Sequence, residues 1–245
     1  MSRFPHFLVQ VFLILTTRFR DQQISDQMDI LNEDYKGTGL SFRLDSIVRV
    51  LNPDWFDNVA PDNDLQTEMK STYRQGDEKT LNVYTVGFNN DDARGLLGYA
   101  TFPDDYEGNP NDDGVVLLHS TLPQGSSAPY NLGRTLTHEA GHWVGLYHPF
   151  QGGCEGDNDY VADTPAEAYP ASGCPGVRDT CPSMGDDRMY NFALPLSHLV
   201  SHPLPFKAVQ NFMDYADDEC MLNFTPGQVD RFKDQLRVYR GIDLD

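Results

Sequence analysis

The chain has 245 residues, a formal net charge of −19 and a sequence pI of about 4.5. With 37 acidic residues against 18 basic ones, it lacks the basic footprint of a nucleic-acid-binding protein, and anionic membrane surfaces would repel it. The length is sufficient to bury a full hydrophobic core in one or two lobes.

Residues 4–15 form the most apolar stretch, which is too short to span a bilayer. We predict a buried β-strand here, because the segment from Val9 to Thr17 is dense in strand-forming residues. The alternative is the core of a signal peptide, since Arg3 precedes the stretch. No pro-segment is recognisable ahead of it, as expected of a mature form or of a truncated or imperfect gene model.

Periodicity predicts alternating helices and strands over the next hundred residues. Helical spacing of apolar residues indicates one helix over residues 24–35 and another over residues 65–73, each closed by glycine. Strands are predicted at residues 40–51, as one strand or two, and then at 81–88, 96–102 and 115–118.

The segment from His138 to His148 reads HEAGHWVGLYH and carries the strongest chemical signal. His138 and His142 are four residues apart, so a helix places both imidazoles on one face. Glu139 lies beside them and can hold a water molecule. Gly145 can adopt backbone angles that other residues avoid, which lets the helix end and return His148 as a third nitrogen ligand. Three protein ligands plus water are typical of a catalytic zinc site.

The segment from Gln151 to Asp187 is predicted to be mostly loop and contains a cluster of acidic residues. Asp157, Asp159 and Asp163, with Glu155, are either a solvated acidic loop or a calcium site, because hard cations take several carboxylate and carbonyl oxygens. Their spacing is not that of an EF-hand.

All four cysteines follow the histidine motif, at Cys154, Cys174, Cys181 and Cys220. Their number is even and none forms a CxxC pair, so we predict two disulfides in an oxidising compartment, with free thiols as the alternative. Four cysteines allow three connectivities. Near the C-terminus, Thr225 to Gln228 predicts a capping box with proline at the first helical position, and an apolar stripe continues from Val229 to Tyr239.

The histidine motif and the later run Asn211 to Tyr215 together resemble the metzincin metalloproteases. In that family Met213 would be the Met-turn residue below the histidines, and Tyr215 would reach the metal or the reaction intermediate. The finer resemblance is to the pappalysin-like M43 branch, through HEAGHWVGLYHPFQGGC, RDTCP and NFMDYADDECMLNFTPGQ. It runs from about Gln23 to the C-terminus.

This resemblance implies an α+β fold, with a twisted mixed sheet and two long helices in an upper lobe of residues 1–148. The lower lobe, residues 149–245, would be irregular, tied by disulfides and closed by a C-terminal helix. The resemblance favours pairing Cys154 with Cys181 and Cys174 with Cys220. It also implies calcium binding in some relatives, and a cleft-rim strand before the zinc helix, which we assign to residues 115–118.

One segment departs from the family pattern. Deleting Ala193–Phe212 would join Asn191-Phe192 directly to Met213, which suggests an inserted loop or a translated intron. A transcript lacking the segment would support the intron. His198 and His202 lie inside it, but the surrounding prolines argue against a helix and hence against a second metal site.

The resemblance implies a secreted, monomeric metalloendopeptidase with one zinc ion and protein or peptide substrates. In the expected mechanism, water activated by zinc attacks the peptide bond, Glu139 acts as general base and Tyr215 assists at the oxyanion. The first alternative is a zinc-binding homologue whose proteolysis the insert impairs. The others are a non-enzymatic secreted binding module and a zinc hydrolase acting on non-peptide amides.

Overall fold

The structure is a computed structural model that describes residues 6–15, 21–176, 178–182 and 210–244. The chain divides into two compact units, one formed by residues 1–145 and 232–245, the other by residues 146–231. The first unit ends at Gly145, whereas the expected upper lobe ends at residue 148. The chain from Phe232 onward, expected in the lower lobe, belongs to the first unit. Most of the suspected insert, including His198 and His202, lies outside the described residues.

The first unit contains a five-stranded sheet with the order β2-β1-β3-β5-β4. Its strands are β1 (His6–Leu15), β2 (Ser41–Leu51), β3 (Thr80–Val86), β4 (Gly98–Ala100) and β5 (Val115–Leu118). All neighbours are parallel except β4, which runs antiparallel to β5. The sheet is therefore mixed, as expected for the α+β class.

Two strand predictions have clear outcomes. The apolar N-terminal stretch is a strand inside the sheet, paired with β2 on one side and β3 on the other. The assignment of residues 115–118 to the exposed rim was wrong, because β5 is paired on both sides. Among the described residues, β4 is the strand at the edge beside it, and the side of Gly98 to Ala100 that faces away from β5 pairs with no strand.

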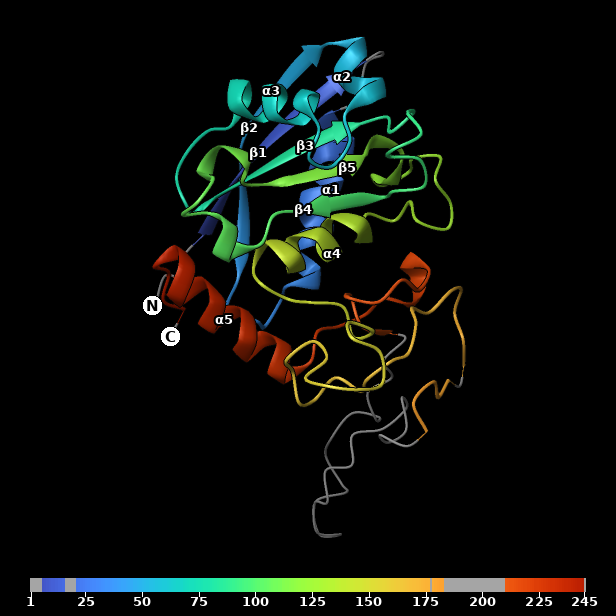
Figure 1. Ribbon diagram of the computed structural model, residues 1–245. Helices are drawn as coiled ribbons and strands as arrows, with labels where there is room; N and C mark the ends of the chain where they lie inside the picture. The colour runs from blue at the N-terminus through green and yellow to red at the C-terminus, as the bar shows by residue number, and fades with distance from the viewer. Residues whose placement is uncertain (1–5, 16–20, 177, 183–209, 245) are drawn as a thin grey trace. The chain divides into compact units, whose positions relative to one another are not determined.

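Helices cover both faces of this sheet, which explains why β3 is buried along its whole length. On one face, α2 (Pro53–Asn58) and α3 (Asp64–Tyr73) pack on a core that includes Phe12, Tyr84 and Val116. The other face carries α1 (Asp21–Asp34) and α4 (Arg134–Trp143), as Figure 1 shows. The short helix α2 was not predicted from the sequence.

The second unit has little regular structure, and cross-links and polar contacts replace extended packing. Two disulfides join Cys154 to Cys181 and Cys174 to Cys220, the pairing that the family resemblance implies. Such cross-links typically contribute about 2–4 kcal/mol to stability.

The C-terminal helix α5 (Pro226–Arg240) begins in the second unit with the predicted capping box. Thr225 N donates to Gln228 Oε1, and Gln228 N donates to Thr225 Oγ1, each at 2.9 Å. In the first unit the same helix buries Phe232 and Leu236. None of the helices in the described ranges has the length and apolar character needed to cross a membrane.

Candidate active site

Helix α4 carries the first two histidines of the motif. His138 and His142 are both buried, and their Nε2 atoms are 3.1 Å apart. The rings are nearly perpendicular, with centroids 4.8 Å apart. The four-residue spacing thus places two nitrogen donors at one point on the helix, as the sequence predicts.

The chain leaves α4 by a turn at Gly145. This glycine has a φ of +104° and its N–H donates to the His142 carbonyl at 2.8 Å, so the helix ends there as predicted. A Cβ at Gly145 would lie 2.7 Å from Gln235 Cβ. Within the continuous segment 138–148, one ligand atom from each of His138, His142 and His148 lies within 4.8 Å of the others.

Three clustered imidazole nitrogens are a donor set that fits zinc. Imidazole is a common zinc ligand, whereas calcium and magnesium require mainly oxygen ligands. Three protein ligands also leave one position for water, which is the pattern of a catalytic site. The residues present therefore fit the metal that the motif predicts.

Glu139 follows the first histidine and is only 5% exposed. Burial raises the pKa of its carboxyl to about 8, an effect that a neighbouring divalent cation would oppose. Its Oε2 atom has no hydrogen-bond partner among the described residues. A Cβ at Gly98, on the edge strand β4, would lie 2.9 Å from Glu139 Cγ and 3.0 Å from Oε1. The absence of a side chain at Gly98 thus leaves room for this carboxylate.

In the second unit, His148 lies in an aromatic group with Phe150 and Tyr215. His148 stacks on Phe150 with ring centroids 4.6 Å apart, and Tyr215 meets its edge at 5.0 Å. Tyr215 is 45% exposed, so its ring is accessible to a bound molecule. The third predicted ligand and the predicted assisting tyrosine are therefore neighbours.

The predicted Met-turn is buried and hydrogen-bonded. Met213 is fully buried, and its N–H donates to Asn211 Oδ1 at 2.8 Å. The Asn211 amide also exchanges two hydrogen bonds with the amide of Gln228, at 2.8 and 3.0 Å. The turn is thus fixed to the capping box of α5. The role of Met213 beneath the histidines stays a prediction.

A buried ion-pair network beside this turn was not predicted from the sequence. Arg178 Nη1 lies 3.1 Å from Glu167 Oε2 and 3.7 Å from Asp214 Oδ2. Asp214 Oδ1 accepts from the backbone N–H groups of Tyr215 at 2.8 Å and Ala171 at 2.9 Å. This network fixes the backbone of Tyr215. The only signal in the sequence is that Arg178 and Asp214 fall within the quoted family segments.

The acidic loop residues have internal partners, so the prediction of a calcium site gains no support. Asp159 accepts from Val161 N at 3.0 Å and Thr164 Oγ1 at 2.5 Å. Asp163 accepts from Thr225 Oγ1 and Gly227 N, both at 2.6 Å, which caps α5. Asp157 is exposed. Apart from the histidines, the described residues offer one further ligand group, Cys174, Glu219 and Cys220, whose cysteines are already joined in a disulfide.

The first unit also contains a cavity of about 550 Å³ that includes neither Glu139 nor the histidines among its lining residues. Its wall carries Asp62, Lys70, Tyr99 and Asp112, and Lys70 forms a buried ion pair with Asp112 at 3.0 Å. The motif residues are therefore a separate site.

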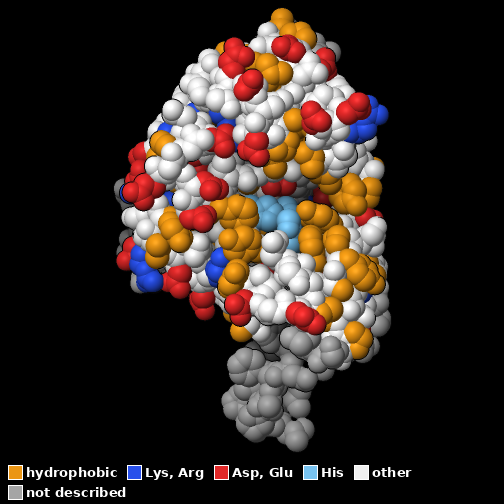
Figure 2. All heavy atoms as spheres, in the orientation of Figure 1, with side chains coloured by type: hydrophobic (Ala, Val, Ile, Leu, Met, Phe, Trp, Pro, Cys, Tyr) orange, Lys and Arg blue, Asp and Glu red, His pale blue; other side chains and the backbone are white. Residues whose placement is uncertain are grey.

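On the face drawn in Figure 2, histidine side chains gather at one place with hydrophobic side chains on either side.

Two fungal proteins and one sequence family similar to this chain are described as metalloproteases or peptidases. The sequence profile of peptidase family M43, described as pregnancy-associated plasma protein-A, matches residues 64–237. The extracellular metalloprotease 1 of Coccidioides posadasii is 41% identical over 223 residues, covering 90% of this chain and 70% of that protein. The extracellular metalloprotease of Colletotrichum graminicola is 42% identical over 226 residues, with the same coverage.

A solved structure agrees with these sequences. Mature mirolysin of Tannerella forsythia, in complex with a cleaved peptide, is similar with a TM-score of 0.70 and 26% identity. The similarity covers 98% of each chain.

Proposed function

The chain belongs to peptidase family M43 and is a metalloendopeptidase, and we propose that it cleaves peptide bonds with a zinc ion held by His138, His142 and His148. One observation carries this proposal. The three imidazoles bring their ligand atoms within 4.8 Å of one another, next in sequence to the buried Glu139. Zinc, when bound there, would lower the pKa of a water molecule to about 7 and polarise the peptide carbonyl.

Glu139 is the proposed general base. Its Oε2 atom has no partner among the described residues, so it is available to accept a proton from the attacking water. The same carboxyl then donates that proton to the leaving amine. Burial of this side chain keeps bulk water away from the proton transfer.

Tyr215 is proposed to stabilise the oxyanion that develops on the peptide carbonyl. Its ring lies against His148 and is 45% exposed, so its hydroxyl can donate a hydrogen bond to a substrate atom near that ligand. The hydrogen bond from its own N–H to Asp214 fixes its backbone and thus limits the positions of the hydroxyl.

Secretion is proposed on two grounds. The similar fungal proteins are named extracellular metalloproteases, and the two disulfides require an oxidising compartment. We also propose that the protein acts as a monomer on extended protein or peptide substrates. The position of β4 at the edge of the sheet, with no further strand beside it among the described residues, supports the substrate assignment, because a strand edge can pair with an extended peptide of any sequence.

Cleavage-site profiling on a peptide library, with and without a chelator, tests the proposed function. We expect cuts within peptides that disappear on chelation and return with added zinc. Zinc binding without any cleavage would instead support the proteolytically impaired homologue. Cleavage that persists in the metal-free protein would contradict the role of the three histidines.

A further inference from the structure

The carboxyl end of the zinc helix is held by a buried group of polar side chains. Trp143, the last residue of α4, follows His142 directly and is fully buried. Its carbonyl belongs to the last turn of the helix, where backbone acceptors lack partners within the helix. Two residues beyond it the chain turns at Gly145 toward His148. The position of Trp143 therefore affects His142, which precedes it directly, and His148, which follows the turn.

Arg240, near the end of α5, contacts Trp143 in two ways. Its guanidinium lies over the indole ring, 3.9 Å from the ring centroid, and its Nη2 donates to the Trp143 carbonyl at 3.3 Å. A positive charge at this position also complements the negative end of the helix dipole. Arg240 is 2% exposed, so these contacts are made away from water.

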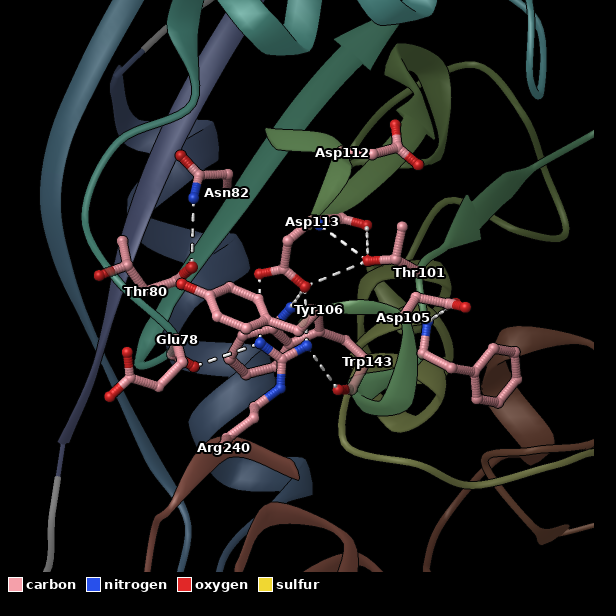
Figure 3. Close-up of polar contacts among 12 residues, drawn as sticks. Glu78, Thr80, Asn82, Thr101, Asp105, Tyr106, Asp112, Asp113, Trp143 and Arg240 are labelled. Carbon is pink, nitrogen blue, oxygen red and sulfur yellow. Dashed lines mark hydrogen bonds and ion pairs between the residues drawn. The ribbon is translucent and has the colours of Figure 1, made fainter. Parts of the chain in front are cut away.

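Asp113 is the third member of the group and contacts both Arg240 and Trp143, as Figure 3 shows. Its carboxylate accepts from Arg240 Nη2 at 2.7 Å and from Nη1 at 3.2 Å, and from the Trp143 indole N–H at 3.0 Å. Asp113 is 1% exposed. Two fork-like bonds between a buried carboxylate and a buried guanidinium fix orientation more strictly than a single ion contact would.

The same carboxylate also reaches the edge strand. Thr101, the residue after β4, donates from Oγ1 to Asp113 Oδ1 at 3.2 Å, and its Oγ1 accepts from Gly114 N at 2.9 Å. At the other end of β4, Gly98 lies beside Glu139. The group thus links the end of the zinc helix to the strand that borders the proposed general base.

We propose that Arg240 and Asp113 are positioning residues for the metal site. They hold the last turn of α4 against β4, and so set the directions in which His142 and Glu139 point. The inference rests on the proposed function, since it assigns these two residues to the same zinc centre. Residues hydrogen-bonded directly to metal ligands typically change metal affinity by about 10–100-fold when replaced. Arg240 and Asp113 act through Trp143, so the lower end of that range applies.

The test is the zinc dissociation constant of Arg240→Lys, measured on the full chain by competition with a chromogenic chelator. Lysine keeps the positive charge beside Asp113 but loses the fork and the flat contact with Trp143. We expect zinc binding to weaken by about 10-fold. With cobalt in place of zinc, we also expect an altered visible absorption spectrum, because the ligand directions change.

Lys70→Met is the matched control. Lys70 is another buried cation of the first unit, paired with Asp112, which lies next to Asp113. We expect it to lower the melting temperature while leaving zinc affinity and the cobalt spectrum unchanged. All affinities are compared at a temperature where each variant is fully folded, so that loss of stability does not appear as loss of affinity.

A lower melting temperature for Arg240→Lys with wild-type zinc affinity and cobalt spectrum would overturn the inference and leave the group a purely structural one. If Arg240→Lys does not fold, Trp143→Phe replaces it, because it removes the indole N–H that bonds Asp113. Unchanged affinity in Trp143→Phe would equally overturn the inference. A wild-type chain that binds no zinc would overturn the proposed function itself, which separates the two failures.

Discussion

The carboxyl group of Glu139 is buried, and its Oε2 atom has no hydrogen-bond partner in the part of the chain that the structure describes. The sequence predicts its chemistry, because HExxH places an acid next to two nitrogen ligands. Its surroundings come only from the structure, which places Gly98 of a different element within contact distance. The motif thus indicates which residue is the general base, while the fold determines how much space its carboxylate has.

Replacing Glu139 by alanine should separate metal binding from catalysis. We expect Glu139→Ala to keep zinc while losing proteolysis by about 100-fold or more, because the proton acceptor is gone and the ligands remain. Zinc content and turnover of a fluorogenic peptide measure the two effects. Glu107→Ala, at an exposed loop position, is the control. Unchanged turnover in Glu139→Ala would remove this residue from the role of base.

A methyl group at Gly98 should displace the Glu139 carboxylate. The added Cβ would lie 2.9 Å from Glu139 Cγ, and displacing a catalytic group by ~1 Å costs about 100-fold in rate. We expect Gly98→Ala to lower kcat by about 10-fold or more with a smaller effect on KM. Gly108→Ala is the control, since its Cβ would meet only a carbonyl at 3.7 Å. A wild-type kcat in Gly98→Ala would show that the carboxylate has room to move.

Site residues divide into those that a sequence can indicate and those that it cannot. The histidines and Glu139 lie within one short motif whose spacing has a direct helical meaning. Arg240 and Asp113 are 127 positions apart, and each is an ordinary charged residue in its local sequence. Only folding brings them together, so no local pattern could have identified the pair.

At the scale of elements, helices were easier to predict than strand order. The spacing that predicts a helix over residues 24–35 corresponds to α1, and the capping box at Thr225 corresponds to the start of α5. Which strand forms the sheet edge depends on pairing across the chain. The short segment Gly98–Ala100 has few strand-forming residues, yet it pairs with β5 and takes the edge position.

The start of α5 offers a test of what the acidic loop does. Asp163 accepts hydrogen bonds from Thr225 and Gly227 at that helix end. We expect Asp163→Ala to cost about 1–2 kcal/mol of stability, which is typical of a lost cap. The loss should be the same with and without added calcium, as measured by thermal unfolding.

Asp157→Ala is the control, because that side chain is exposed. A loss in Asp163→Ala that occurs only in the presence of calcium would contradict the capping role. It would restore the calcium site predicted for Asp157, Asp159 and Asp163.

Across the whole molecule, the net charge of −19 is compatible with a protein that works in solution on peptides rather than on nucleic acid. The α+β class was implied by the family resemblance, and the mixed sheet with its helices agrees with it. The cysteine number alone left three pairings open, and the resemblance indicated the pairing that the structure forms.

Acidification should remove the metal and with it the activity. Imidazoles bind zinc only when neutral, so protons compete with the metal as the pH falls. We expect activity to decrease on the acidic side, with a midpoint that moves to lower pH as free zinc is raised. Peptide turnover measured across pH at several zinc concentrations tests this. An acidic midpoint independent of zinc would assign the loss to another group.

The central claim is that one zinc ion at His138, His142 and His148 is required for peptide hydrolysis. The most direct measurement strips the purified protein of metal and follows turnover of a peptide during titration with zinc. The account predicts no turnover in the metal-free protein and a linear return that reaches its plateau at one zinc per chain. Turnover without metal, or one bound zinc without turnover, would contradict it.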